Sequence, residues 1–224
     1  MTITIVQDTN ANAPSGTGAL TITPGAAYAA GALLVVTSSV SSAGAITSIT
    51  GGGVTTWNLV RSDFSAGFMA EIWYGYNSGG GSAAVVVTYT STGAKYANCV
   101  ELGGAIASGV ATDGVNGASG INGTSINSGD VTPTAATEVI LFNSGAFQAA
   151  TAAVAGPATW TSLASRAPST QYPSSYKIIA SASGSYNATY AIGYNRFAVN
   201  IAAFKAGGGG GGGNRRRRLI LIGA

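Results

Sequence analysis

The sequence predicts an all-β protein, an antiparallel β-sandwich of two similar halves followed by an extended C-terminal tail. Three observations lead to this prediction. Short runs of β-branched and other apolar residues alternate with clusters of Gly, Ser and Asn, and no window of useful length has a helical period. The order of these runs in the first half of the chain recurs in the second half. After residue 206 the composition changes to glycine, arginine and a short apolar end.

The composition supports a folded chain with many turns. Charged residues make up only 8% of the chain, but hydrophobic residues make up 46%, enough to bury a core. At 224 residues the chain can do so without disulfides, and its one cysteine, Cys99, excludes an internal disulfide. Cys99 lies in an apolar-alternating run, so we expect a buried, inert thiol. The 34 glycines are typical of strands joined by tight turns.

Glycine or Ser/Asn clusters such as 51–53 and 79–81 separate the candidate strands. The candidates in the first half are residues 2–6, 19–23, 33–37, 56–60, 69–74, 84–89 and 96–102. The candidates in the second half are residues 138–142, 159–163, 176–180, 188–192 and 197–204.

An internal repeat relates the two series, with an offset of a little over a hundred residues. Five segments correspond in order: 33–38 to 139–144, 56–59 to 159–162, 71–74 to 177–180, 85–89 to 191–194, and 96–100 to 197–201. Trp57 and Trp160 occupy equivalent places, which favours core packing for both.

The repeat predicts one unit over residues 1–206, with half-repeats at about 17–103 and 122–205. About five strands per half are few for a free sandwich, so we expect the halves to pack face to face around one shared core. Two separate domains are the alternative. Residues 103–137, rich in Gly, Ser, Asn and Thr, are interpreted as the connection between sheets, with a short strand near 124–126; a flexible inter-domain linker is the other interpretation.

Few residues in the chain could carry chemistry. There is no histidine, one cysteine does not make a zinc site, and the seven carboxylates are scattered without a paired spacing. The sequence therefore predicts no enzyme, no cofactor and no metal site. Residues 113–117 could offer oxygen ligands to calcium, but an ordinary Asx-rich loop is the favoured interpretation. Among the aromatic residues, Trp73, Tyr74 and Tyr76 are the best candidates for an exposed glycan-binding or interface patch, with core or rim packing as the alternative.

The tail, residues 207–224, carries the strongest local signal. Seven glycines are followed by Asn214, four arginines and four apolar residues. The arginines can pair with carboxylates or phosphates, and the β-prone end, too short to span a membrane, could extend a partner's sheet. We therefore predict a docking tail; a solvated tail is the alternative. The predicted partner-binding residues are Arg215, Arg216, Arg217, Arg218, Leu219, Ile220, Leu221 and Ile222.

The tail also accounts for the basic character of the chain. Net charge is +3, but without the four arginines the body has six basic residues against seven acidic ones. A basic face for nucleic acid is therefore not expected. The first residues lack a basic region and a long apolar stretch, and no apolar run approaches the length of a membrane span. The sequence thus predicts synthesis in the cytoplasm and no membrane partner.

The order of segments 33–36, 47–52, 56–60, 70–74 and 84–87 resembles the jelly-roll, lectin-like module of bacteriophage virion structural proteins and bacterial surface proteins. The likeness covers roughly residues 17–205 and brings no catalytic residues. The glycine-arginine tail also resembles the C-termini of some tailed-phage structural proteins.

The resemblance implies a non-enzymatic virion structural protein: a capsid decoration, head-fibre or tail component displayed on the particle and anchored through its tail. Its expected partners are other virion subunits, in a homo-oligomer or with a capsid or tail protein, and its location is the virion after synthesis in the host cytoplasm. The alternative is a glycan-binding or adhesin module of a cell surface or appendage, with a host-surface glycan as partner.

Overall fold

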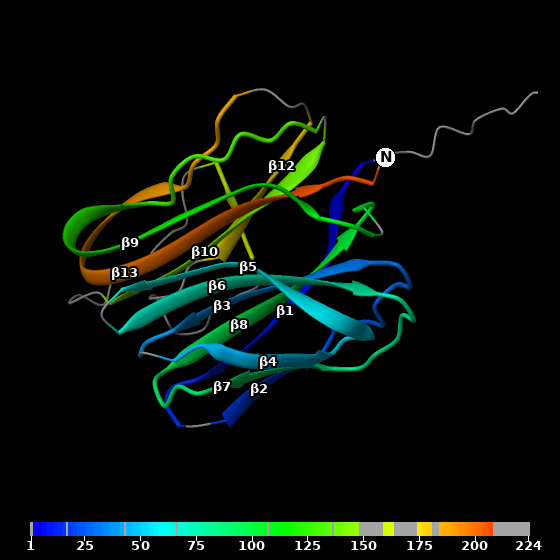
Figure 1. Ribbon diagram of the computed structural model, residues 1–224, viewed down its shortest axis with the longest axis horizontal. Coiled ribbons are helices and arrows are strands. Elements are labelled where there is room, and N and C mark those ends of the chain that lie inside the picture. The colour runs from blue at the N-terminus through cyan, green and yellow to red at the C-terminus, as the bar shows by residue number, and fades with distance from the viewer. Residues whose placement is uncertain are drawn as a thin grey trace, which may run out of the picture.

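The computed structural model describes residues 2–16, 18–42, 44–65, 67–106, 108–135, 137–147, 159–163, 174–180 and 184–207. Within these ranges every regular element is a β-strand, and every strand pair is antiparallel. The predicted all-β antiparallel fold is confirmed. The strands form three sheets that lie one above another in Figure 1.

The first half of the chain forms two sheets. The five-stranded sheet has the order β1 (Thr4–Ala13), β8 (Lys95–Gly103), β3 (Leu33–Val40), β6 (Phe68–Asn77) and β5 (Val54–Ser65). The three-stranded sheet has the order β2 (Gly18–Ile22), β7 (Val85–Tyr89) and β4 (Ile46–Gly51).

The second half forms one five-stranded sheet with the same strand order. Its strands are β9 (Thr112–Asn127), β13 (Thr189–Lys205), β10 (Glu138–Phe147), β12 (Ser174–Ile179) and β11 (Thr161–Ser162). In this sheet β13 takes the place of β8, β10 that of β3, β12 that of β6 and β11 that of β5. β9 takes the edge position that β1 has in the first sheet.

The two tryptophans lie at matching register positions. Trp57 directly precedes Asn58, which pairs with Tyr74, and Trp160 directly precedes Thr161, which pairs with Tyr176. On their other sides the two tyrosines pair with Val35 and Leu141, which correspond in the repeat.

Two predictions about the chain path are wrong. Residues 112–127, interpreted as part of a connection with an Asx-rich loop, form the sixteen-residue strand β9, and residues 188–192 and 197–204 fall in one strand, β13, apart from residue 188. β9 and β13 pair with each other along their length: Thr112 lies opposite Phe204 at one end of the ladder, and Asn127 lies opposite Thr189 at the other. β9 is rich in Gly, Asn and Ser and lacks apolar alternation, but main-chain hydrogen bonds do not require it.

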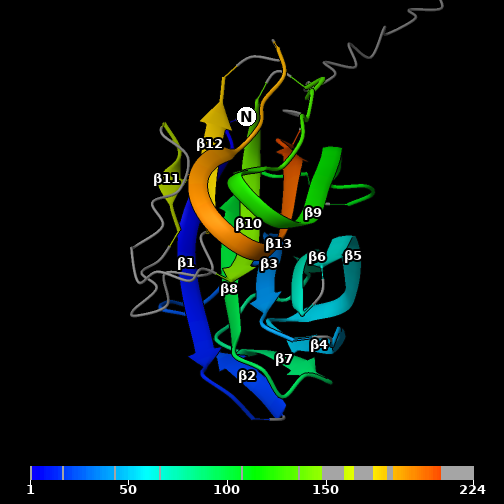
Figure 2. The ribbon, with the colours of Figure 1, turned by 90° about the vertical axis from the view of Figure 1, so that its left-hand side faces the viewer.

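The two five-stranded sheets pack against each other (Figures 1 and 2). The apolar side chains between them form the shared core. Successive side chains of a strand point to opposite faces of its sheet, so only alternate residues reach this core. Leu33 and Val35 of β3 face the shared core, and so do Val139 and Leu141 of β10. The residues between them face away from it.

The shared core is not the only core, so the expectation of a single one is also corrected. The outward face of the first five-stranded sheet carries Leu34 and Val36 and is covered by the three-stranded sheet. The outward face of the second carries Phe142, on which Trp160 packs edge-to-face at 6.3 Å between ring centroids. Trp57 packs against the first of these outer clusters, so core packing of both tryptophans is confirmed.

The shared core generates a prediction about Leu141, which is fully buried between the two five-stranded sheets. Leu141→Ala should lower the free energy of unfolding by about 2–5 kcal/mol, because it removes buried methyl groups and leaves a cavity. Leu59→Ala is the matched control, since Leu59 is 48% exposed, and should cost less than about 1 kcal/mol. Urea unfolding measures both. Equal losses for the two variants would show that the sheets do not share a packed core.

Candidate functional site

The predicted docking residues, Arg215–Arg218 and Leu219–Ile222, lie outside the described residues, which end at Gly207. Their partner-binding role stays a prediction. The described residues do include the point where the tail leaves the body.

The three aromatic residues predicted as a patch do not share one face of the sheet. Tyr74 is buried in the shared core, and Tyr76 packs against the same core with its ring 5.8 Å from that of Tyr74. The Tyr76 hydroxyl donates to the carbonyl oxygen of Gly109 at 3.0 Å. Trp73 points to the opposite face, where it packs against the outer cluster of the first half and donates from Nε1 to Glu71 at 3.0 Å. The structure therefore brings Tyr74 and Tyr76 together but separates them from Trp73.

A buried polar group joins the two halves at the centre of the molecule. Asn143 of β10 is fully buried and donates from Nδ2 to the carbonyl oxygen of Ser38 at 2.7 Å. Its Oδ1 accepts hydrogen bonds from the hydroxyls of Ser39 and Ser174, each at 3.0 Å. Because buried polar atoms without partners are costly, these bonds fix how β3 and β10 lie against each other.

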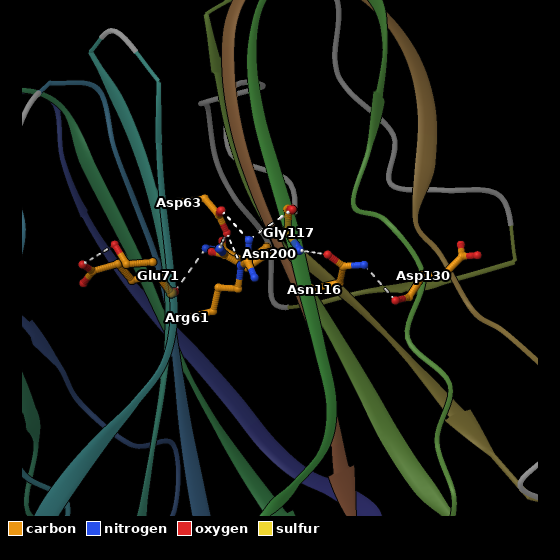
Figure 3. Close-up of polar contacts among 9 residues, drawn as sticks. Arg61, Asp63, Glu71, Asn116, Gly117, Asp130 and Asn200 are labelled. Carbon is orange, nitrogen blue, oxygen red and sulfur yellow. Dashed lines mark hydrogen bonds and ion pairs between the residues drawn. The ribbon is translucent and has the colours of Figure 1, made fainter.

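A second polar group joins β5 to β9 and β13 (Figure 3). Arg61 donates from Nε to Asp63 at 2.6 Å and from Nη2 to the carbonyl oxygen of Gly117 at 3.2 Å. Asn200 of β13 donates to the same Asp63 oxygen at 2.5 Å. A Cβ on Gly117 would clash with that oxygen, so a residue larger than glycine would force the strands apart. We call this group and the Asn143 group together the polar seam.

The last strand before the tail, β13, ends at a point held by several backbone contacts. Ala206 pairs with Ala105 in an isolated bridge, and its N–H donates to the carbonyl oxygen of Thr137 at 3.1 Å. The N–H of Gly207 donates to the carbonyl oxygen of Gly104 at 2.7 Å. Gly104 also lies against Thr2, so the end of β13 lies beside the N-terminal end of the described chain (Figure 1). We call residues 205–207 and these partners the tail exit.

Two carboxyl groups meet beside the tail exit, a pairing that the sequence does not predict. Asp113 near the start of β9 and Glu138 at the start of β10 both accept a hydrogen bond from the N–H of Ala135, at 2.9 and 3.1 Å, so the two carboxyl groups lie close together. Burial, and then the Asp113 carboxyl, raise the pKa of Glu138 to about 8. The hydrogen bond with Glu138 holds the pKa of Asp113 well below its usual range. Since 24 residues separate them in the chain, no local motif could have revealed the pair.

Other buried titratable groups serve packing. Burial raises the pKa of Glu71, whose carboxyl accepts from Ser62 and Trp73 at 3.0 Å each. Burial also raises the pKa of the Cys99 thiol to about 12, so the expectation of a buried thiol is confirmed. Glu101 is 1% exposed and accepts hydrogen bonds from the Gln7 side chain at 2.7 Å and from the N–H of Ala29, between β2 and β3, at 2.8 Å.

No family model, curated protein or solved structure matches the chain. Across the described ranges, no three His, Cys, Asp or Glu side chains gather as metal ligands would. The same ranges hold no helix of the length and hydropathy that crossing a bilayer requires.

The polar seam generates a prediction about Asn143. Asn143→Ala should lower the free energy of unfolding by about 2–4 kcal/mol, because the Ser39 and Ser174 hydroxyls and the Ser38 carbonyl lose a buried partner. Asn187→Ala is the control: Asn187 is exposed and bonds to the Asp130 side chain, and its loss should cost about 0.5 kcal/mol or less. Chemical denaturation distinguishes the two. Similar small effects would mean that the seam contributes little.

Proposed function

We propose that the chain is a non-enzymatic structural protein of a bacteriophage particle, displayed as a capsid decoration, head-fibre or tail component and anchored through its C-terminal tail. The phage assignment rests on the resemblance of the strand segments and of the glycine-arginine tail. The observation that supports anchoring is the tail exit, where backbone contacts hold the residues of the chain that directly precede the tail.

The body is suited to such a role because its strands are tied across both halves. The shared core and the polar seam join the five-stranded sheets, so a force applied at the tail exit passes through β13 into β9 and β10, its two neighbours. β13 pairs with β9 and β10 along most of its seventeen residues. A tail attached to an interior strand of the sheet is held by two ladders of hydrogen bonds.

The exposure of the carboxylates on the body indicates whether the four arginines of the tail could bind a second copy of the chain. Six of the seven are at least partly buried, and Asp130, the exposed one, accepts a hydrogen bond from Asn187. A second copy of the body thus offers few exposed acidic acceptors, which favours a different virion subunit as the anchor. The glycan-binding alternative has less support, because Trp73 lies on the opposite face from Tyr74 and Tyr76.

The test is to delete residues 208–224 from the protein while it is expressed during assembly of the phage particles. Circular dichroism should show a folded body, because the core clusters lie within residues 3–204. Quantitative mass spectrometry of purified particles should then show loss of the truncated protein from the particle. As a matched pair, replacement of all four arginines by serine should lower occupancy in moderate salt, and replacement by lysine should lower it less. A folded, truncated protein present at wild-type occupancy would refute the anchoring role.

A further inference from the structure

The carboxyl pair beside the tail exit is arranged to hold a loop in place. Asp113 Oδ2 accepts hydrogen bonds from the N–H groups of Thr134 and Ala135 at 2.7 and 2.9 Å, and the Thr134 hydroxyl donates to the same carboxylate at 2.8 Å. The N–H of Ala135 also donates to Glu138 Oε1 at 3.1 Å. The loop that precedes β10 is therefore tied to both acids.

The contacts of Glu138 leave a place for one proton. Glu138 is fully buried, and its Oε2 has no hydrogen-bond partner among the N–H and O–H groups of the described residues. Two carboxylates that accept from the same N–H lie too close for both to be ionised at low cost, because like charges repel. With one proton on Glu138 Oε2, that oxygen can donate to Asp113, which remains the charged partner of the loop N–H groups.

The other charges around Glu138 do not replace this proton. On β13 the paired residue is Lys205, whose charge has the smallest of the effects on the pKa of Glu138 and lowers it. On β12 the paired residue is Ile179, and the nearest titratable residue of that strand is Lys177, which lies opposite Ile140 instead. On β9 the facing group is Asp113 itself. Desolvation by these neighbours keeps the protonated form favoured.

We propose that Asp113 and Glu138 form a one-proton latch that closes the tail exit at acidic pH and loosens it as the pH rises. The connection to the tail exit is direct. Thr137, adjacent to Glu138, accepts the hydrogen bond from Ala206, and Ala111, two residues before Asp113, accepts that from Lys205. Release of the proton to solvent leaves two negative charges at one N–H group, and the strand ends that carry them then separate more easily.

The sign of the pH dependence follows from the raised pKa of Glu138. In a locally opened state Glu138 has an ordinary glutamate pKa, so it releases its proton at lower pH than in the closed state. The latch stabilises the closed state fully at pH values below the ordinary pKa of a glutamate. This stabilisation is lost as the pH rises to about 8, the pKa of Glu138 in the closed state. Above that pH both states are ionised and the loss levels off.

Hydrogen exchange of the full chain tests the latch without any partner. The protection of the Ala206 and Ala135 amides, corrected for intrinsic exchange, should fall by about tenfold per pH unit between roughly pH 5.5 and 7.5. In Glu138→Gln the side-chain amide can donate to Asp113 at every pH, so protection should not depend on pH. Asp130→Asn, which alters an exposed carboxylate that accepts from Asn187 instead, should behave as the wild type.

Carbon-13 titration of the glutamate carboxyls in the wild type gives an answer that does not depend on the variant folding. The Glu138 signal should titrate far above an ordinary glutamate. Titration of Glu138 near its ordinary value, or the same pH dependence of protection in Glu138→Gln, would overturn the latch. Neither result would bear on anchoring in the particle, which the truncation experiment tests separately.

Discussion

The structure depends on burial of both faces of its two five-stranded sheets. One face of each sheet contributes to the shared core, and the other is covered by an outer cluster of apolar residues. A central strand such as β3 is buried along its whole length, so none of its side chains can obtain hydrogen bonds from bulk water. Polar residues in these strands are therefore stabilised by partners within the protein, as Ser38, Ser39 and Asn143 are.

This constraint gives the polar seam its role. An apolar surface between two sheets tolerates small sliding movements, whereas hydrogen bonds from Asn143 and from the Arg61–Asp63 pair are satisfied in one relative position. The shared core supplies most of the attraction, and the seam selects the arrangement. Burial has a related effect at the tail exit. It raises the pKa of Glu138, so the protonation state of this carboxyl affects the local structure.

Sequence patterns predict those elements whose side chains carry the signal. Apolar runs such as 33–37 and 138–142 are central strands, and the equivalence of Trp57 and Trp160 is seen in their register. β9 escapes such prediction because its order comes from main-chain pairing with β13, which leaves no apolar pattern in its Gly- and Asn-rich sequence. The Asp113–Glu138 pair escapes it because the pair forms only when the starts of two strands are brought together in space.

Scanning calorimetry of the full chain tests most directly whether the two halves are one folded unit. Because the shared core and the seam join them, the account predicts a single transition in which the calorimetric enthalpy equals the van't Hoff enthalpy. Two resolved transitions, or a calorimetric enthalpy well above the van't Hoff value, would show that the halves unfold independently and would contradict it.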